Sequence, residues 1–187
     1  MTPLPLDCEA AFCPDFLGAD EAAELFAELL ADYSVTAPSQ FGGLPVFMFG
    51  DPVCITAAAL PEVWGGRAEW PASLAAVRDR IAEETGIRFE VARTVYYHDG
   101  QAKMGFHSDL PAYGCTKNIA SLSLGAEREF VLRRGDSPED RLSVQLTPGS
   151  LVFMGPGTQQ RYEHGLLPDP NCHEPRLNLT FRRFGFA

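Results

Sequence analysis

Hydrophobic residues repeat at helical spacing in two segments of the N-terminal half. In the run EAAELFAELLAD the apolar positions recur at intervals of three and four, at Ala23, Phe26, Leu29 and Leu30. This spacing predicts a helix over residues 21–31, with Asp20 as its N-cap. A second helix is predicted from Pro71 to Gly86, because proline favours the first helical turn and glycine the position just past the last one.

From Arg88 onward the pattern changes to short runs rich in Val, Leu, Phe and Tyr, separated by Gly and Pro turns. Strands are predicted over residues 89–97, 119–124, 129–133, 142–146, 150–154 and 177–184. Many short strands with regular turns are typical of a β-sandwich or barrel, so we expect a mainly β (α+β) fold with the two helices packed on one face.

At 187 residues the chain has the size of one domain. We divide it into an N-terminal part over residues 1–87 and a β core over residues 88–187. The N-terminal part holds the two helices and, between them, a stretch broken by Gly and Pro that we expect to form short strands, loops and a substrate lid.

The last predicted strand alternates strictly between apolar and polar residues. Leu177, Leu179 and Phe181 form one face, and the other face carries Arg176, Asn178, Thr180 and Arg182. If the polar face looked at water, it would be an ordinary solvated strand face. If it looked into a barrel, its charges would need partners, and a dicarboxylate such as 2-oxoglutarate supplies two carboxylates for bidentate pairing with arginine.

A His-x-Asp pair, His107 and Asp109, is the main candidate for metal binding. In an extended segment residues i and i+2 point the same way, so both side chains can meet one ion. His164, which follows a strand and a turn, is a candidate third ligand. Two histidines and one carboxylate with open positions form the site of non-haem Fe(II) oxygenases. The pair alone is also what turns use for capping and hydrogen bonding, so the motif by itself leaves both readings open.

Charge and cysteine usage narrow the class of protein. The net charge of −10 and the pI of about 4.8 argue against a general nucleic-acid binder, because like charges repel at long range. Five irregularly spaced cysteines are typical of reduced thiols, so we expect a cytoplasmic protein. We also expect the protein to be a monomer. The N-terminus has no signal-peptide pattern, and no run of about 18 apolar residues occurs, so no membrane association is expected.

An ordered set of motifs resembles the AlkB family of 2-oxoglutarate oxygenases. The resemblance spans most of the chain and is strongest over residues 85–184. It is carried by Tyr97-His-Asp-Gly100, His107-Ser-Asp109, Ile119-Ala-Ser-Leu-Ser-Leu-Gly125, Arg128-Glu-Phe130, Pro148-Gly-Ser-Leu-Val-Phe-Met154, Thr158-Gln159, Tyr162-Glu-His164 and Arg176-Leu-Asn-Leu-Thr-Phe-Arg182. Each motif alone is weak, whereas the set in this order is specific.

The resemblance implies a double-stranded β-helix (jelly-roll) core with an iron site. It implies Fe(II) on His107, Asp109 and His164. It further implies 2-oxoglutarate with its distal carboxylate near Tyr97 and Arg176, and its iron-chelating end near Asn178 and Arg182. Thr180 lies on the same strand face and is a further candidate for binding the co-substrate. The implied reaction consumes dioxygen and 2-oxoglutarate, hydroxylates a carbon attached to nitrogen, and so demethylates bases such as 1-methyladenine or 3-methylcytosine in DNA or RNA.

The departures from the family pattern lie on the substrate side. Val95 stands where many repair members have Asn, and Pro111 where many have an acidic residue that meets the exocyclic amine of the base. The segment Ile55–Leu60 contains no aromatic residue, although a flipped base is usually stacked on one. Two roles remain open for Phe41, Phe47, Phe49 and Trp64. Each either stacks on the base from another position or belongs to ordinary core packing. Two roles likewise remain open for a set of arginines, which either form a track that binds phosphates or are ordinary solvated charges. These are Arg88, Arg93, Arg133, Arg134, Arg141 and Arg161.

Three functions therefore remain open. The first is dealkylation of a nucleobase, which the resemblance favours. The second is the same oxygenase chemistry on a small molecule or a protein side chain, which the charge and the substrate-side departures favour. The third is a barrel that binds a metal or a carboxylate without turnover, and the complete set of three ligands with both arginines argues against it.

Overall fold

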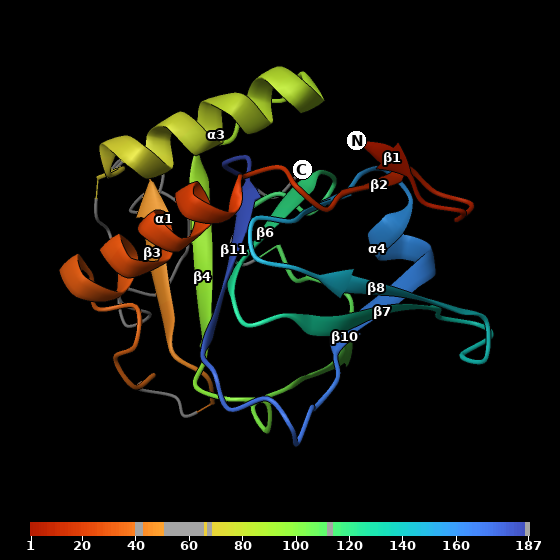
Figure 1. The fold of residues 1–187 in the computed structure, drawn as a ribbon. Coiled ribbons are helices and arrows are strands. Elements are labelled where there is room, and N and C mark those ends of the chain that lie inside the picture. Colours follow the sequence, from red (N-terminus) through yellow and green to blue (C-terminus); the bar gives the residue numbers. More distant parts are fainter. Residues whose placement is uncertain (40–42, 51–65, 67–68, 112–113, 186–187) are drawn as a thin grey trace.

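Two antiparallel β-sheets face each other across the interior of the molecule (Figure 1). The computed structural model describes residues 1–187 except 40–42, 51–65, 67–68, 112–113 and 186–187. The larger sheet has seven strands, in the spatial order β1 (Thr2–Pro3), β2 (Ala10–Cys13), β9 (Leu151–Met154), β6 (Ile119–Gly125), β11 (Arg176–Arg182), β4 (Val91–Tyr97) and β3 (Val46–Gly50). The smaller sheet has four, in the order β5 (Met104–His107), β10 (Tyr162–Leu166), β7 (Arg128–Arg134) and β8 (Arg141–Leu146). The mainly β prediction is confirmed.

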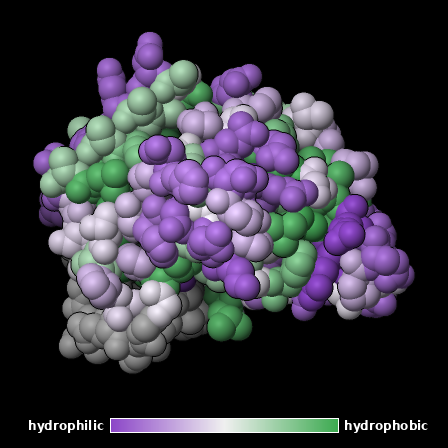
Figure 2. Space-filling view, turned by 60° about the horizontal axis from the view of Figure 1, so that its bottom comes forward, coloured by the Kyte–Doolittle hydropathy of each residue, from purple (hydrophilic) through white to green (hydrophobic). Residues whose placement is uncertain are grey.

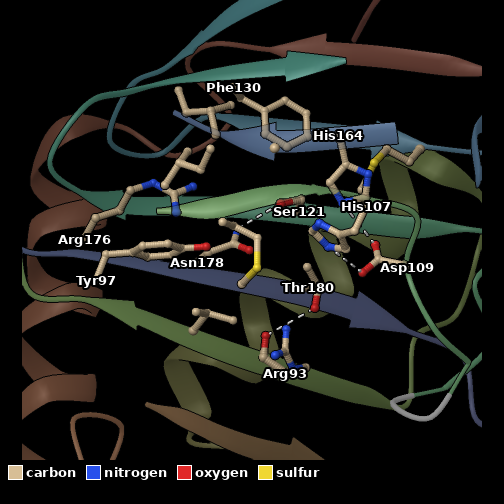
Figure 3. Close-up of a pocket in the computed structure, with 16 residues that line it drawn as sticks. Arg93, Tyr97, His107, Asp109, Ser121, Phe130, His164, Arg176, Asn178 and Thr180 are labelled. Atoms are coloured by element: carbon tan, nitrogen blue, oxygen red, sulfur yellow. Dashed lines mark hydrogen bonds and ion pairs between the residues drawn. The ribbon is translucent and has the colours of Figure 1, made fainter. Parts of the chain in front are cut away.

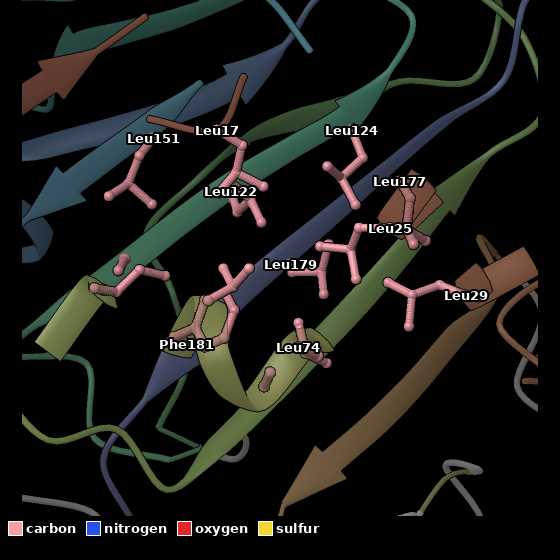
Figure 4. Packing of buried hydrophobic residues seen from close by; sticks show 14 of the residues in the cluster. Leu17, Leu25, Leu29, Leu74, Leu122, Leu124, Leu151, Leu177, Leu179 and Phe181 are labelled. Atoms are coloured by element: carbon pink, nitrogen blue, oxygen red, sulfur yellow. The ribbon is translucent and has the colours of Figure 1, made fainter. Parts of the chain in front are cut away.

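Both predicted helices are present, as α1 (Ala19–Asp32) and α3 (Ala72–Thr85). They lie on the outward face of the larger sheet, as predicted (Figure 1). Their buried side chains pack on apolar residues of the strands beneath (Figure 4), among them Leu25, Leu29, Leu74, Leu122, Leu124, Leu177, Leu179 and Phe181. Because each fully buried apolar side chain contributes roughly 1.5–3 kcal/mol, this layer fixes the sheet that carries the site.

The predicted C-terminal glycine of α3 is found in the structure, whereas the predicted N-cap of α1 is not. The N-cap of α1 is Gly18, so the prediction of Asp20 as the N-cap is wrong. Asp20 lies instead in the first turn, where its carboxylate is favoured by the positive end of the helix dipole. At the end of α3, Gly86 has a left-handed φ of 69° and donates its N–H to the carbonyl of Ala82, as a C-terminal glycine should.

Strand β11 lies between β6 and β4 and has the predicted alternation of apolar and polar side chains on its two faces. Its apolar residues point to the helices, and its polar residues face the smaller sheet. The register places Arg176 opposite Tyr97, Asn178 opposite Val95, and Thr180 opposite Arg93. On the other side, Ser123 of β6 lies opposite Asn178, and Ser121 lies opposite Thr180. The inward face of β11 is therefore a row of polar side chains.

Several short elements were not predicted from the sequence. These are β1, β2, β5, β10 and the one-turn helix α4 (Thr158–Arg161). Each is four or five residues or fewer, which is too short to show a period. Between the helices the structure describes β3, whereas the segment Ile55–Leu60 and most of the expected lid lie outside the described residues.

The face shown in Figure 2 is covered mostly by hydrophilic side chains. The face in Figure 2 shows hydrophobic side chains only in small separate groups. Large hydrophobic residues are exposed at Leu110 and Phe184. Four cysteines are free thiols, namely Cys8, Cys13, Cys115 and Cys172, and Cys54 lies outside the described residues. None of the described helices combines the length and apolar character needed to cross a bilayer.

Candidate metal and co-substrate site

The two histidines of the candidate triad lie opposite each other on neighbouring strands. His107 ends β5, His164 belongs to β10, and the strand register pairs them with ring centroids 4.5 Å apart. Asp109 follows in the loop, with Oδ1 3.8 Å from His107 Nε2 and Oδ2 3.6 Å from His164 Nε2. One ligand atom from each residue lies within 4.8 Å of the others. The structure thus brings together the three residues predicted to bind metal (Figure 3).

The hydrogen bonds around the triad leave its inward atoms available. His107 Nδ1 lies 2.8 Å from the carbonyl oxygen of Gly105, so this nitrogen carries the proton and Nε2 keeps its lone pair. Asp109 Oδ2 is buried and has no hydrogen-bond partner among the residues that the structure describes. A buried carboxylate oxygen in that state is costly unless a cation meets it. The donor set, two imidazoles and one carboxylate, is the one that Fe(II) sites use.

The surroundings keep His164 and Asp109 in the protonation states that bind metal. Burial lowers the pKa of His164 from 6.5 to about 4, although the charge of Asp109 acts in the opposite direction. Burial alone would raise the pKa of Asp109, but Arg182 and the two histidines outweigh it, so this pKa lies below its usual 3.8. At neutral pH His164 is therefore neutral and Asp109 is ionised, as coordination requires.

Two residues from other elements hold Asp109 in place. Arg182 donates from Nη2 to Asp109 Oδ1 at 2.8 Å and from Nη1 to the carbonyl of Leu110 at 2.8 Å. Gln159, on α4, accepts the backbone N–H of Asp109 through Oε1 at 2.8 Å. The structure thus places the Arg182 guanidinium directly against the candidate metal ligand. Gln159 was given no role from the sequence, where its one signal was the Thr158-Gln159 motif.

The other end of the polar row is a buried cationic site. Arg176 is only 2% exposed, its Nη2 donates to Ser123 Oγ at 3.0 Å, and its Cζ lies 5.2 Å from the ring centroid of Tyr97. Burial lowers the pKa of Arg176 to about 10, so it stays charged at neutral pH. Its Nε has no hydrogen-bond partner in the described part of the chain. A buried guanidinium in this state suits a carboxylate ligand.

Asn178, Thr180 and Arg93 line the wall between these two ends (Figure 3). Asn178 Nδ2 donates to Ser121 Oγ at 2.8 Å and to the carbonyl of Leu122 at 3.0 Å. Thr180 Oγ1 donates to the carbonyl of Arg93 at 3.3 Å. The cavity, counted with its opening to solvent, encloses about 470 Å³ and is shared by the triad and Arg176.

Arg128 supports the cationic end from behind. It is only 2% exposed and donates to the carbonyl oxygens of four residues, Asp99, Gly100, Ala102 and Leu167. These bonds tie the turn that follows Tyr97 to the segment after β10. The sequence marked Arg128 only as part of a motif, because its acceptors are backbone atoms that no side-chain pattern reveals.

The residues considered for the substrate side lie partly in the cavity and partly away from it. Val95 lines the cavity, and Pro111 is exposed. Phe49 is fully buried in the core on the helix side of the larger sheet, and Phe47 packs against the same core, so neither is a stacking platform in the cavity. Phe41 and Trp64 lie outside the described residues.

Comparison with known families decides what this site belongs to. The profile described as the 2OG-Fe(II) oxygenase superfamily matches residues 9–182. The chain belongs to this superfamily. Fe(II) and 2-oxoglutarate, with dioxygen as the oxidant, are accordingly its cofactors, as predicted. The triad fits the iron, because it offers the right donors around an unpartnered buried oxygen, and Arg176 fits the dicarboxylate.

Curated relatives confirm the resemblance to the AlkB family. The alpha-ketoglutarate-dependent dioxygenase alkB homolog 3 of Bos taurus is 31% identical over 186 residues, which cover 91% of this chain and 64% of the relative. The DNA oxidative demethylase ALKBH2 of Bos taurus is 39% identical over 122 residues, which cover 61% of this chain and 44% of the relative. This chain thus spans less than two thirds of each of these superfamily members.

A solved superfamily member shares the fold. The structure of OsALKBH1 superposes with a TM-score of 0.67 at 16% sequence identity, and the match covers 96% of this chain and 100% of that one. At this identity the likeness concerns the fold alone. It confirms the predicted jelly-roll core of the AlkB type, with facing antiparallel sheets and helices on one face.

Proposed function

We propose that this chain is an Fe(II)- and 2-oxoglutarate-dependent oxygenase that removes alkyl groups from nitrogen atoms of nucleobases in nucleic acid. The observation that carries the proposal is the arrangement of one cavity. A two-histidine, one-carboxylate triad stands at one end, and a buried arginine without a carboxylate partner in the described chain stands at the other. A dicarboxylate bound to Arg176 would point its second end toward the triad.

In this proposal each polar residue of the cavity has a defined task. His107 Nε2, His164 Nε2 and Asp109 Oδ2 hold the iron. Arg176 and Tyr97 bind the distal carboxylate of 2-oxoglutarate. Asn178 and Thr180 line its path, and Arg182 fixes Asp109 beside the chelating end. The chemistry supplied when iron, dioxygen and 2-oxoglutarate are bound is hydroxylation of the N-linked carbon, with succinate, carbon dioxide, an aldehyde and the free N–H as products.

The protein contributes mainly position and protonation state. Asp109 stays ionised and His164 neutral, so no proton competes for the metal ligands at neutral pH. The sheet walls keep the reacting carbon, the metal and the co-substrate in one small space, which converts an encounter of several molecules into a local step. Burial of the Arg176 end also excludes water, which strengthens its interaction with a carboxylate.

The nucleobase part of the proposal is supported by relatives whose names include DNA oxidative demethylase. A second candidate is the same oxygenase chemistry on a small molecule or a protein side chain. It is favoured by the net charge of −10 and by Pro111 in place of an acidic residue. Four free thiols support action in a reducing compartment, the cytoplasm in our proposal, and we propose a monomer that works without a membrane.

The test measures succinate from purified protein with Fe(II), 2-oxoglutarate and ascorbate. Reactions run with and without single-stranded oligonucleotides that carry an N-methylated base, and mass spectrometry reads the base. We expect succinate coupled to loss of a methyl group. His107→Ala and Asp109→Ala should abolish both, and Mn(II) binding under nitrogen should be lost in the same variants. Uncoupled succinate alone would support the second candidate, and no succinate in any condition would overturn the oxygenase proposal.

A further inference from the structure

Arg133 touches both strands that carry the ligand histidines. It lies on β7, and its Cζ is 4.0 Å from the ring centroid of Phe106 on β5. Its Nε and Nη2 also donate to Glu163 Oε2 on β10, at 2.8 and 2.6 Å. Phe106 directly precedes His107 in the chain, and Glu163 directly precedes His164. One guanidinium therefore meets the immediate neighbours of both histidines.

The contacts of Arg133 lie on the outer face of the smaller sheet. Successive residues of a strand point to opposite faces, and His107 and His164 point into the cavity. Phe106 and Glu163 therefore point away from the cavity, and the strand register places Arg133 directly opposite Glu163. Arg133 can thus hold the two ligand strands together from behind the site, without contact to a metal or a substrate.

Strand β5 receives less support from the sheet than β10 does. Among the described strands β5 pairs with β10 alone, whereas β10 also pairs with β7. The register of β5 with β10 is irregular between His164 and Leu166, and the residue between these two is Gly165. A Cβ added at Gly165 would lie 3.3 Å from Phe106 Cδ1. The absence of a side chain at Gly165 therefore lets the Phe106 ring lie close against β10, where Arg133 covers it.

Other arginines of this region make contacts of a different kind. Arg134 pairs with Asp7 at 2.8 Å, and Arg161 is within ion-pair distance of the same carboxylate. These pairs join β7 and α4 to the N-terminal segment. A single ion pair that is partly exposed, as that of Arg133 with Glu163 also is, contributes little by itself. Arg133 differs because it combines an ion pair on one ligand strand with a cation–π contact on the other.

We propose that Arg133 is a positioning residue for the metal site, which holds β5 against β10 and so keeps His107 in register with His164. This inference rests on the proposed function, because it takes the triad as the metal site. A metal needs both imidazoles in place at once, so its apparent affinity falls with the fraction of protein in which the two strands are aligned. Loss of the Arg133 contacts lowers that fraction.

The experiment titrates Mn(II) under nitrogen into metal-free wild type and variants. Arg133→Met removes the charge and Phe106→Leu removes the ring, and each should weaken Mn(II) binding by about 3- to 10-fold, the range for a cation–π contact together with a partly exposed ion pair. Arg133→Lys should recover part of the affinity, because it keeps a cation over the ring. The control is Arg141→Met, at the exposed arginine opposite Arg133 on β8, which should bind Mn(II) as the wild type does.

The direction of the change separates positioning from a simple effect of charge. Removal of a positive charge by itself would favour a bound cation, so weaker Mn(II) binding in Arg133→Met has the opposite sign. The double variant Arg133→Met with Phe106→Leu should lose less affinity than the two single losses combined, because both single changes remove the same contact. Urea unfolding of each metal-free variant measures the support that the contact gives to the fold alone.

Three outcomes would contradict the inference. Wild-type Mn(II) affinity in both Arg133→Met and Phe106→Leu, with only a lower urea midpoint, would show a contact that supports the fold and not the metal site. Independent, fully additive losses in the double variant, or an equal loss in Arg141→Met, would also overturn the inference. Each of these results would leave the proposed function standing. A wild type that binds no Mn(II) would overturn the metal assignment and, with it, the role of Arg133.

Discussion

Arg182 donates to Asp109 Oδ1 and to the carbonyl oxygen of Leu110, both at 2.8 Å. One guanidinium therefore holds the side chain of a proposed metal ligand and the backbone that follows it. Arg182 itself is fully buried at the end of β11, and its strand is fixed under the helices by Phe181. The orientation of the carboxylate is thus set by the core of the larger sheet rather than by the loop that carries it.

Replacement of Arg182 by Met should destabilise the protein and weaken metal binding together. Loss of one partner of a buried ion pair leaves Asp109 uncompensated, which costs about 3–5 kcal/mol in the free energy of unfolding. The measurement is urea unfolding of the metal-free protein, alongside Mn(II) titration. Arg183→Met, at the exposed neighbour, is the control and should change neither value. Wild-type stability and Mn(II) affinity in Arg182→Met would show that the pair does not support the site.

Replacement of Gln159 by Ala should reduce metal affinity with little effect on the fold. The side chain is the acceptor for the backbone N–H of Asp109, and supporting contacts of this kind are worth about 10- to 100-fold in metal affinity. Mn(II) binding by calorimetry gives the affinity, and circular dichroism monitors the fold. Gln160→Ala, one residue along the same helix and exposed, is the matched control. Equal Mn(II) affinities for the two variants would remove Gln159 from the positioning role.

Replacement of Arg176 by Ala should weaken 2-oxoglutarate by about 10- to 100-fold, because a charge-assisted bidentate pair is lost. Arg176→Lys should recover part of the affinity, since it keeps the charge without the fork. The co-substrate is titrated into Mn(II)-loaded protein, with Arg141→Ala, at an exposed residue of β8, as the control. Undiminished 2-oxoglutarate affinity in Arg176→Ala would refute the carboxylate role, while metal binding should persist in every variant of this set.

The metal-free protein should lose stability between neutral pH and pH 4 because of His164. Burial lowers its folded-state pKa from 6.5 to about 4, so between these values the unfolded chain binds more protons. Stability contributed by neutral His164 is therefore present above pH 6.5 and decreases as the pH falls toward 4. From pH 7 to 4 the wild type should lose about 3 kcal/mol more than His164→Asn. Urea unfolding at stepped pH measures this difference, with exposed His98→Asn as the control, and parallel curves for wild type and His164→Asn would contradict it.

The sequence predicted the parts of the site that depend on local periodicity. The alternation of β11 placed Arg176, Asn178, Thr180 and Arg182 on one face, and the structure has them facing the cavity or its margin. The same rule would have found Arg93, because it lies an even number of residues from Tyr97 on one strand and so shares its face. From the sequence, Arg93 was expected either in a phosphate track or as an ordinary solvated charge.

Contacts between distant segments could not be read from the sequence. Gln159 meets Asp109 across fifty residues, and no local pattern couples a one-turn helix to that loop. Strands β5 and β10 contain Gly105 and Gly165 and are too short to show alternation, so their pairing appears only in the fold. The sequence therefore gave the triad as separate residues, and the direct register of His107 with His164 required the structure.

The position of His107 gives metal binding a second consequence. Strand β5 is the four-residue edge of the smaller sheet, and β10 is its neighbour. A metal held by His107 and His164 cross-links this edge to the next strand, so its binding free energy also opposes local opening there. Amide exchange over residues 104–107 should therefore slow on Mn(II) binding, while the centre of the larger sheet exchanges as before. Iron supply would then set how often this edge opens, as well as whether the site can react.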